Sequence, residues 1–198
     1  VRTGRDAPET GYRLFRRHAL DDVGPHDGPR EGEDLGGHRL SVKAARGQTV
    51  KLHFALQPGA EIGKIDVEVS DLVGPDGVRF DPSSVRAGWI DYRISRITMD
   101  GGIYGVKPRY WRPVPAPAAE GVTRRFWLRV DVPPTATPGT YRGTARVSPE
   151  KGEASTVPVE VVILPFTLPA ITDVAVGPWG NHIRLPYHAD DPFTEEWN

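Results

Sequence analysis

The stretch FWLRVDVPPTATPGTYRGTARV, residues 126–147, decides the fold class. Apolar residues occupy every second position of its first half: Phe126, Leu128, Val130 and Val132. Successive side chains of a β-strand point to opposite faces, so this pattern predicts a strand with one buried side. The prolines and glycine within 133–139 end that strand, and a second strand-like run follows at 140–147. These residues therefore predict a β-hairpin.

Similar patterns recur on both sides of this hairpin. Apolar or β-branched residues form further strand-like runs at 40–44, 50–56, 65–72, 89–97 and 157–163. Gly- and Pro-containing turns separate these runs, and no segment has the pattern of an amphipathic helix. The sequence thus predicts an all-β chain, an antiparallel β-sandwich of immunoglobulin-like or jelly-roll character.

Composition excludes several other classes of protein. The 198 residues include 22 Gly and 20 Pro, which break helix interiors and argue against a helical bundle. The absence of Cys excludes disulfide scaffolds, thiolate catalysis and iron–sulfur clusters. A net charge of −1 provides no global attraction to nucleic acid or to an anionic membrane, so we expect neither as a partner. No cofactor is expected.

Changes in composition and in the spacing of apolar residues along the chain predict three parts. Residues 1–38 are polar and irregular and form an N-terminal arm, in which residues 12–15 are a candidate edge strand. Residues 39–169 form the sandwich. Residues 170–198 are expected to be a linker and the truncated start of a following catalytic barrel. The first residue is Val and no signal-peptide pattern follows it, which predicts a segment trimmed from a longer protein.

Several local expectations accompany this division. Residues 100–121 contain four prolines and read as a long loop. Pro158 cannot donate a ladder hydrogen bond, so its strand is expected at a sheet edge or with a bulge. Tyr141 is expected to anchor its hairpin by packing, with a local hydrogen bond from its hydroxyl. His53, on the polar side of its strand, is expected to be solvated.

Four segments carry a resemblance to a known family. They are AARGQ at 44–48, IDVEVSDL at 65–72, WLRVDVPPTATPGTYRGTARV at 127–147 and PVEVVILPFTLP at 158–169. In this order they resemble the N-terminal β-sandwich of family 123 glycoside hydrolases, over roughly residues 39–180. In that family the last segment leads into a TIM-type catalytic barrel.

The resemblance implies a role and a partner for this chain. The family's chemistry lies in an adjacent Asp–Glu pair on the barrel, where Glu is the general acid and Asp orients a substrate acetamido group. The adjacent acids here, at 21–22, 190–191 and 195–196, lack that context. No catalytic residue is therefore predicted, and this segment is not expected to be an enzyme. The resemblance implies a secreted or periplasmic bacterial glycoside hydrolase as parent, acting on N-acetylated or related glycans through a C-terminal catalytic domain.

Aromatic residues in the middle of the chain are candidates for sugar binding. Sugar rings lay apolar C–H faces on aromatic rings while polar side chains bind the hydroxyls. The candidates are Trp89, Tyr92, Tyr110, Trp111, Arg112 and Trp127, with Asp91, Arg93 and Arg109 as further polar groups. Packing against another domain, or plain core packing, are the alternatives for these residues. Trp127 lies on the side opposite Phe126 and Leu128, so we expect it to be exposed or covered by a neighbouring domain.

The C-terminal segment contributes two weaker candidates. Asn181 and His182 would contact substrate if this segment formed the first strand of a barrel, because barrel active sites lie at the carboxyl ends of strands. Together with Asp190 and Asp191, His182 and His188 do not match a closed zinc or calcium pattern, so no metal site is predicted.

Three functions remain open from the sequence. The first is a non-catalytic accessory module that supports or orients a catalytic barrel. The second is an independent carbohydrate-binding module that uses an aromatic face. The third is a structural or adhesion module of a cell-envelope protein.

Overall fold

The structure, a computed structural model, describes residues 10–19, 21–96 and 102–168. The chain divides into two compact units, Val1–Leu168 and Pro169–Asn198, and all described residues belong to the first. The predicted linker and barrel start at 170–198 therefore lie outside the described residues, as do Asn181 and His182.

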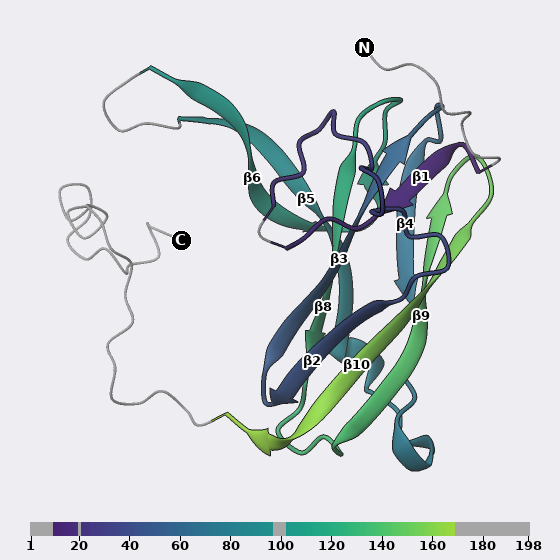
Figure 1. The fold of residues 1–198 in the computed structure, drawn as a ribbon, viewed down its shortest axis with the longest axis vertical. Coiled ribbons are helices and arrows are strands. Elements are labelled where there is room, and N and C mark those ends of the chain that lie inside the picture. Colours follow the sequence, from purple (N-terminus) through teal and green to yellow (C-terminus); the bar gives the residue numbers. More distant parts are fainter. Residues whose placement is uncertain (1–9, 20, 97–101, 169–198) are drawn as a thin grey trace. The chain divides into compact units, whose positions relative to one another are not determined.

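Two five-stranded sheets form the described unit (Figure 1), which confirms the predicted all-β sandwich. One sheet has the order β1-β3-β8-β5-β6, and the other has the order β2-β10-β9-β4-β7. The strands are β1 (Tyr12–Phe15), β2 (Leu40–Arg46), β3 (Thr49–Pro58), β4 (Lys64–Val69), β5 (Val85–Arg96), β6 (Tyr104–Pro113), β7 (Ala116–Pro117), β8 (Arg124–Asp131), β9 (Gly139–Pro149) and β10 (Ser155–Thr167). Two short 3-10 helices, η1 (Pro75–Gly77) and η2 (Pro82–Ser84), precede β5.

Strand β2 is the exception to antiparallel pairing among the described strands, because it runs parallel to β10. A tight turn at Gly47, whose φ is +77°, joins β2 to β3. The two strands lie in different sheets, so this turn crosses between the layers instead of closing a hairpin. A left-handed backbone conformation of this kind favours glycine.

The core lies between the facing sides of the two sheets. Phe126 and Leu128 of β8 are fully buried, as the alternating pattern predicts. Phe54 lies opposite Phe126 in the ladder, and their rings stack with centroids 5.2 Å apart. From the other sheet, Val161 and Ile163 of β10 face this layer in the same cluster. Burial of these apolar side chains is the main favourable term for folding.

Tyr141 of β9 anchors its hairpin, as predicted. Its side chain is buried, and its ring meets the edge of Phe80 at a centroid distance of 4.8 Å. The hydroxyl donates to the backbone oxygen of Thr137 at 3.0 Å. Packing and a local hydrogen bond thus account for this residue.

The prediction of a long loop at 100–121 is wrong, because β6 and β7 lie within it. The four prolines of this stretch favour a loop in the sequence, since proline lacks a backbone N–H for pairing. However, β6 is the edge strand of its sheet, and Pro108 lies beside a bulge at which Arg109 is the extra residue. An edge strand tolerates a residue that has no backbone N–H.

The prediction that Pro158 lies in an edge strand or at a bulge is also wrong, because the β9–β10 register is unbroken at Pro158. That strand lies between β2 and β9. Its pairing with β2 begins at Val159, opposite Leu40, so Pro158 precedes the first residue that has partners on both sides. The missing N–H is therefore accommodated locally. The predicted edge strand at 12–15 is confirmed as β1, which pairs with β3.

Asp131 links the ends of three neighbouring strands. Its carboxylate accepts hydrogen bonds from the Thr49 hydroxyl of β3 at 2.6 Å, from Arg86 of β5 at 2.9 Å and from Arg129 of β8 at 3.0 Å. The Thr49 hydrogen bond is the largest of the effects that lower the pKa of Asp131 to about 2. The ionised carboxylate therefore contributes to the stability of this sheet.

The stacked pair in the core predicts a large effect of truncation. Phe126→Ala should lower the free energy of unfolding by about 3–5 kcal/mol, because it removes a buried ring and leaves a cavity. Phe166→Ala is the matched control, since Phe166 is 49% exposed and should change stability by less than about 0.5 kcal/mol. Urea unfolding of both variants measures the difference. Equal losses would show that Phe126 is not in the core.

From the low pKa of Asp131 we predict that its contribution to the free energy of unfolding depends on pH. Its pKa is lower in the folded protein than the unfolded value near 4, so the stabilisation is complete above about pH 4 and is lost as the pH falls toward 2. Asp131→Asn should cost about 1 kcal/mol at neutral pH, after allowance for solvent screening, and only a small part of this at pH 2, where the folded-state carboxyl is half protonated. Urea unfolding at several pH values would reveal this convergence. A constant difference would contradict it.

Candidate functional site

The six residues predicted to bind sugar lie on three adjacent strands but on both faces of one sheet. Directly opposed residues of an antiparallel pair share a face. Trp89 lies opposite Arg112 and Asp91 lies opposite Tyr110, all on the face that continues from the core, which we call the inner face. The remaining candidates, Tyr92, Trp111 and Trp127, lie on the outer face. The structure therefore does not bring the six residues together on one surface.

Gly88 organises the tryptophans of the outer face. The Trp111 indole of β6 lies against the Cα of Gly88, in the space that a Cβ would need. Trp127 of β8 lies opposite Gly88 in the ladder. Trp127 is half-buried, and the Lys51 ammonium lies 4.3 Å from its ring centroid. This cation covers part of the ring, so Trp127 is not a bare platform.

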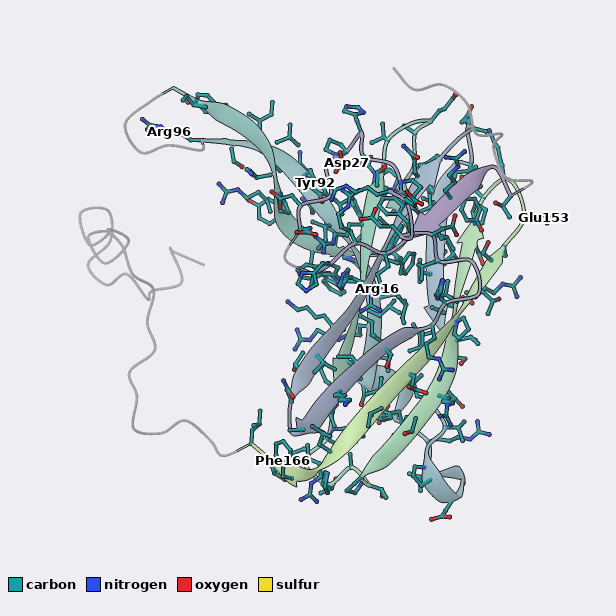
Figure 2. All side chains as sticks on the ribbon, viewed as in Figure 1. Arg16, Asp27, Tyr92, Arg96, Glu153 and Phe166 are labelled. Atoms are coloured by element: carbon teal, nitrogen blue, oxygen red, sulfur yellow. The ribbon has the colours of Figure 1, made fainter. Side chains whose placement is uncertain are left out.

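Tyr92 holds the N-terminal arm to the outer face. Its hydroxyl donates to the backbone oxygen of Val23, and burial raises its pKa. Figure 2 shows Tyr92 close to Asp27 of the arm, whereas Arg96 lies far along the same hairpin. The structure thus gives Tyr92 a role in packing the arm.

Arg17 is the centre of the arm. Its guanidinium is 96% buried and uses all five N–H donors. Nε and Nη2 donate to Glu33 at 2.9 and 3.1 Å, and Nη1 donates to Asp27 at 2.7 Å. The remaining donors reach the backbone oxygens of Asp22 and Gly28. Hydrogen bonding to Arg17 lowers the pKa of Glu33, so this pair is ionised at neutral pH.

His53 lies beneath this arm, so the prediction that it is solvated is wrong. Its Nε2 atom is 2.9 Å from the backbone oxygen of Arg17, and burial lowers its pKa. Arg125 lies on the same face and donates to the backbone oxygens of Asp21 and Ala19. The polar side of β3 and β8 is therefore the surface on which the arm packs.

Asp91 is the centre of the polar cluster on the inner face. The residue is 8% exposed, and its Oδ2 atom accepts hydrogen bonds from Arg112 Nε at 2.7 Å and from Arg93 Nη2 at 2.9 Å. Burial alone would raise the pKa of this carboxyl, but the two guanidiniums outweigh burial and lower it. Asp91 is therefore ionised and holds both arginines in place.

Two more guanidiniums extend this cluster along the sheet. Arg109 Nε donates to the buried hydroxyl of Ser95 at 2.7 Å. At the other end, Arg124 lies over the Trp89 ring at 5.4 Å, and its charge acts on Asp91. Tyr110 is 56% exposed beside Arg112, whose guanidinium lies 5.5 Å from the Tyr110 ring centroid. We call this group the Asp91 cluster: Asp91, Arg93, Arg109, Tyr110, Arg112 and Arg124.

Sequence reasoning did not single out Arg124 or Ser95. The two-residue alternation contains a signal for both. Arg124 precedes Phe126 by two positions and so shares its face, while Ser95 follows Asp91 by four and shares the face of that carboxylate. The arm residue Arg17 has no comparable signal, because its partners lie in an irregular segment with no strand alternation.

The remaining candidates for chemistry find little support among the described residues. No group of three or more His, Asp or Glu side chains there could hold a metal ion. Asp21 and Asp22 are both exposed, so they lack the enclosure that a glycosidase acid requires. Asp190, Asp191, Glu195, Glu196 and His188 lie outside the described residues. In the same part of the chain, no helix is long and apolar enough to span a membrane.

Two surface hollows lie along the arm. Their volumes are about 460 and 340 Å³, and Asp34, Leu35 and Gly37 line both of them. Neither hollow includes any of the six predicted sugar-binding residues. These two hollows are therefore separate from the predicted sugar-binding residues.

Comparisons with known proteins bear on the fold. No family model matches the sequence, and no curated protein matches it either. Among solved structures, a family 123 glycoside hydrolase from Clostridium perfringens, studied for glycolipid glycan hydrolysis, aligns with a TM-score of 0.53 at 14% identity. The alignment covers 65% of this chain and 23% of the hydrolase. The likeness is one of fold, and this chain spans less than a quarter of that enzyme.

More distant matches include fimbrial subunits. The CooA pilin of enterotoxigenic Escherichia coli aligns at 11% identity and a TM-score of 0.37, covering 78% of this chain and 99% of the pilin. The MyfA subunit of Yersinia enterocolitica fimbriae, in complex with galactose, aligns at 12% identity and a TM-score of 0.34, covering 63% and 91%. Similarity at this level does not bear on function.

The contact between the arm and His53 predicts that loss of the arm changes the pKa of His53. Arg17→Ala should release the arm and raise the pKa of His53 toward its usual value near 6.5, because the arm causes the burial that lowers this pKa. NMR titration of the imidazole measures this change. Arg39→Ala is a suitable control, since Arg39 pairs with Glu160 on the other sheet. An unchanged pKa in Arg17→Ala would show that the arm does not depend on Arg17.

Proposed function

We propose that this chain is a non-catalytic accessory β-sandwich of a glycoside hydrolase-like protein. In this proposal the sandwich supports or orients a C-terminal catalytic barrel that acts on N-acetylated or related glycans. The observation that carries the proposal is the alignment with one portion of a longer glycoside hydrolase. The sequence segments at 44–48, 65–72, 127–147 and 158–169, which resemble the same family, support it independently.

The ionisation state of three carboxylates in the strands supports a non-catalytic role. A glycosidase needs one carboxyl group that is protonated near neutral pH and can act as general acid. Asp91, Asp131 and Glu160 each accept hydrogen bonds from two arginines, and each has a lowered pKa. These groups are ionised at neutral pH and have no proton to donate. Their chemistry suits the positioning of cations.

The proposal also includes a location and a partner. Family resemblance favours a secreted or periplasmic parent protein. The partner of the sandwich would be the catalytic domain of that same parent, reached through the chain that follows β10.

A carbohydrate-binding module is the second candidate function. Tyr110 favours it, because this exposed ring lies beside the guanidinium of Arg112, whose side chain is 46% exposed. Such a ring can stack on the apolar face of a sugar. The two functions are compatible, since an accessory module can also bind glycan.

Activity measurements on the parent protein test the first proposal. The complete parent and a version lacking residues 10–168 are assayed with a chromogenic N-acetylated glycoside, beside the 198-residue chain alone. We expect turnover by the complete parent, reduced kcat/KM or a lower Tm without the sandwich, and no turnover by the isolated chain. Turnover by the isolated chain, or full activity and stability without the sandwich, would contradict the proposal.

A further inference from the structure

The sandwich contains three carboxylates that are each bracketed by two arginines. The sets are Asp91 with Arg93 and Arg112, Asp131 with Arg86 and Arg129, and Glu160 with Arg39 and Arg142. At Asp131 and Glu160 the additional group is a hydroxyl, from Thr49 or Ser41. At Asp91 the additional groups are two more arginines and an exposed tyrosine ring. The Asp91 cluster thus differs from the other two in its charge.

The Asp91 cluster has an excess of positive charge. Arg93 and Arg112 pair with the Asp91 carboxylate, and the charge of Arg124 also acts on it. Arg109 lies further along the strand, at Ser95. The cluster therefore holds four positive charges and one negative charge, an excess of three. Like charges held together repel each other, and an anionic ligand would relieve that repulsion. This excess is local, because the whole chain has a net charge of −1.

Two arginines of the cluster keep hydrogen-bond donors that no described residue uses. Arg112 and Arg109 use their Nε atoms toward Asp91 and Ser95, respectively. Their terminal Nη groups have no hydrogen-bond partner among the described residues, and both side chains are exposed. Guanidinium groups fixed in this way present a planar pair of N–H donors that matches the geometry of a carboxylate.

The cluster is elongated. Positions 91, 93 and 95 of β5 share a face, and same-face residues of a strand recur about every 6.7 Å. The guanidiniums therefore follow the strand in a row, beside Tyr110 on the adjacent strand. A linear ligand with repeated negative charges fits such a row better than a single small anion does.

We propose that the Asp91 cluster binds a polysaccharide that contains uronate residues. The guanidiniums of Arg93, Arg109 and Arg112 pair with the carboxylates of the glycan, and a sugar ring stacks on Tyr110. The proposal rests on the proposed function, since it names an anionic glycan as the ligand of a module that accompanies a glycoside hydrolase.

A protein partner fits the inner face less well. The exposed aliphatic residues of the hairpin, Ile94 and Val106, lie opposite each other in the ladder and on the outer face. The inner face offers charge and one aromatic ring instead of an apolar patch. Large apolar patches mark protein interfaces, whereas aromatic rings beside polar groups suit sugars.

Calorimetric titration tests the proposal on the 198-residue chain. The probes are an oligogalacturonate and a neutral oligosaccharide of the same length. We expect only the acidic glycan to bind, with an affinity that falls as ionic strength rises, because salt screens exposed charges. The double variant Arg93→Gln/Arg109→Gln should weaken binding by at least about tenfold, since it removes two charged donors. It leaves Arg112 paired with Asp91, and thermal unfolding confirms that the variant is folded.

The matched control is Arg39→Gln/Arg142→Gln, which removes two arginines from a bracketed carboxylate on the other sheet. We expect this control to change affinity by less than about twofold, because distant exposed charges are screened. Tyr110→Ala should weaken binding several-fold without changing its dependence on salt. An equal loss in the control would overturn the proposal, because it would show non-specific attraction.

Two further outcomes would overturn the proposal. Poly-L-glutamate serves as an acidic probe that has no sugar. If it bound as tightly as the oligogalacturonate and depended on the same arginines, the cluster would recognise an acidic protein surface instead. Absence of binding by the oligogalacturonate would overturn it directly. Either result leaves the activity comparison of the parent protein unaffected, so the two proposals fail separately.

Discussion

The alternation of side chains along β5 connects the core to the candidate site. Trp89 packs into the core, and the same face continues through Asp91, Arg93 and Ser95 as the hairpin extends away from β3 and β8 (Figure 1). Along one face of β5, the side chains therefore change from apolar and buried to charged within a few residues. On the other face, Gly88 provides the space for Trp111. The side chains on both faces of the hairpin are therefore placed by the register of β5 with its neighbouring strands.

The N-terminal arm is stabilised mainly by ion pairs and hydrogen bonds, whereas the sandwich is stabilised mainly by burial of apolar side chains. The buried apolar side chains that the arm contributes are those of Tyr12, Phe15, Val23 and Leu35. Arg17 compensates by joining two carboxylates and two backbone oxygens in one buried group. Removal of Arg17 would leave the Glu33 carboxylate, which is 14% exposed, without its charged partner, and such a loss is costly for a largely buried group. Arg17 thus maintains the arm over His53, and the part of the outer face around His53 and Arg125 is covered by the arm.

Sequence reasoning predicted the sandwich well, since its signal is local. The alternation at Phe126 and Leu128 indicates a buried face without any knowledge of the neighbouring strands. The loop prediction at 100–121 failed because proline has different consequences at an edge strand than inside a sheet. Sequence alone did not show that the candidate residues divide between two faces. That division requires the register between strands and the bulge at Arg109, which shifts the phase of β6.

Three carboxylates of the sandwich, those of Asp91, Asp131 and Glu160, are held in their charged form by pairs of arginines. A carboxylate that accepts hydrogen bonds from two guanidiniums is held in its charged form, and each partner is held in one orientation. At Asp131 this arrangement ties three strands together. At Asp91 the same arrangement fixes cations on an exposed edge, where fewer neighbours need to be joined. The same arrangement of a carboxylate between two arginines therefore stabilises the sheet at Asp131 and presents positive charge to solvent at Asp91. The difference follows from how many strands surround the carboxylate, because an edge hairpin leaves donors with no partner in the sheet.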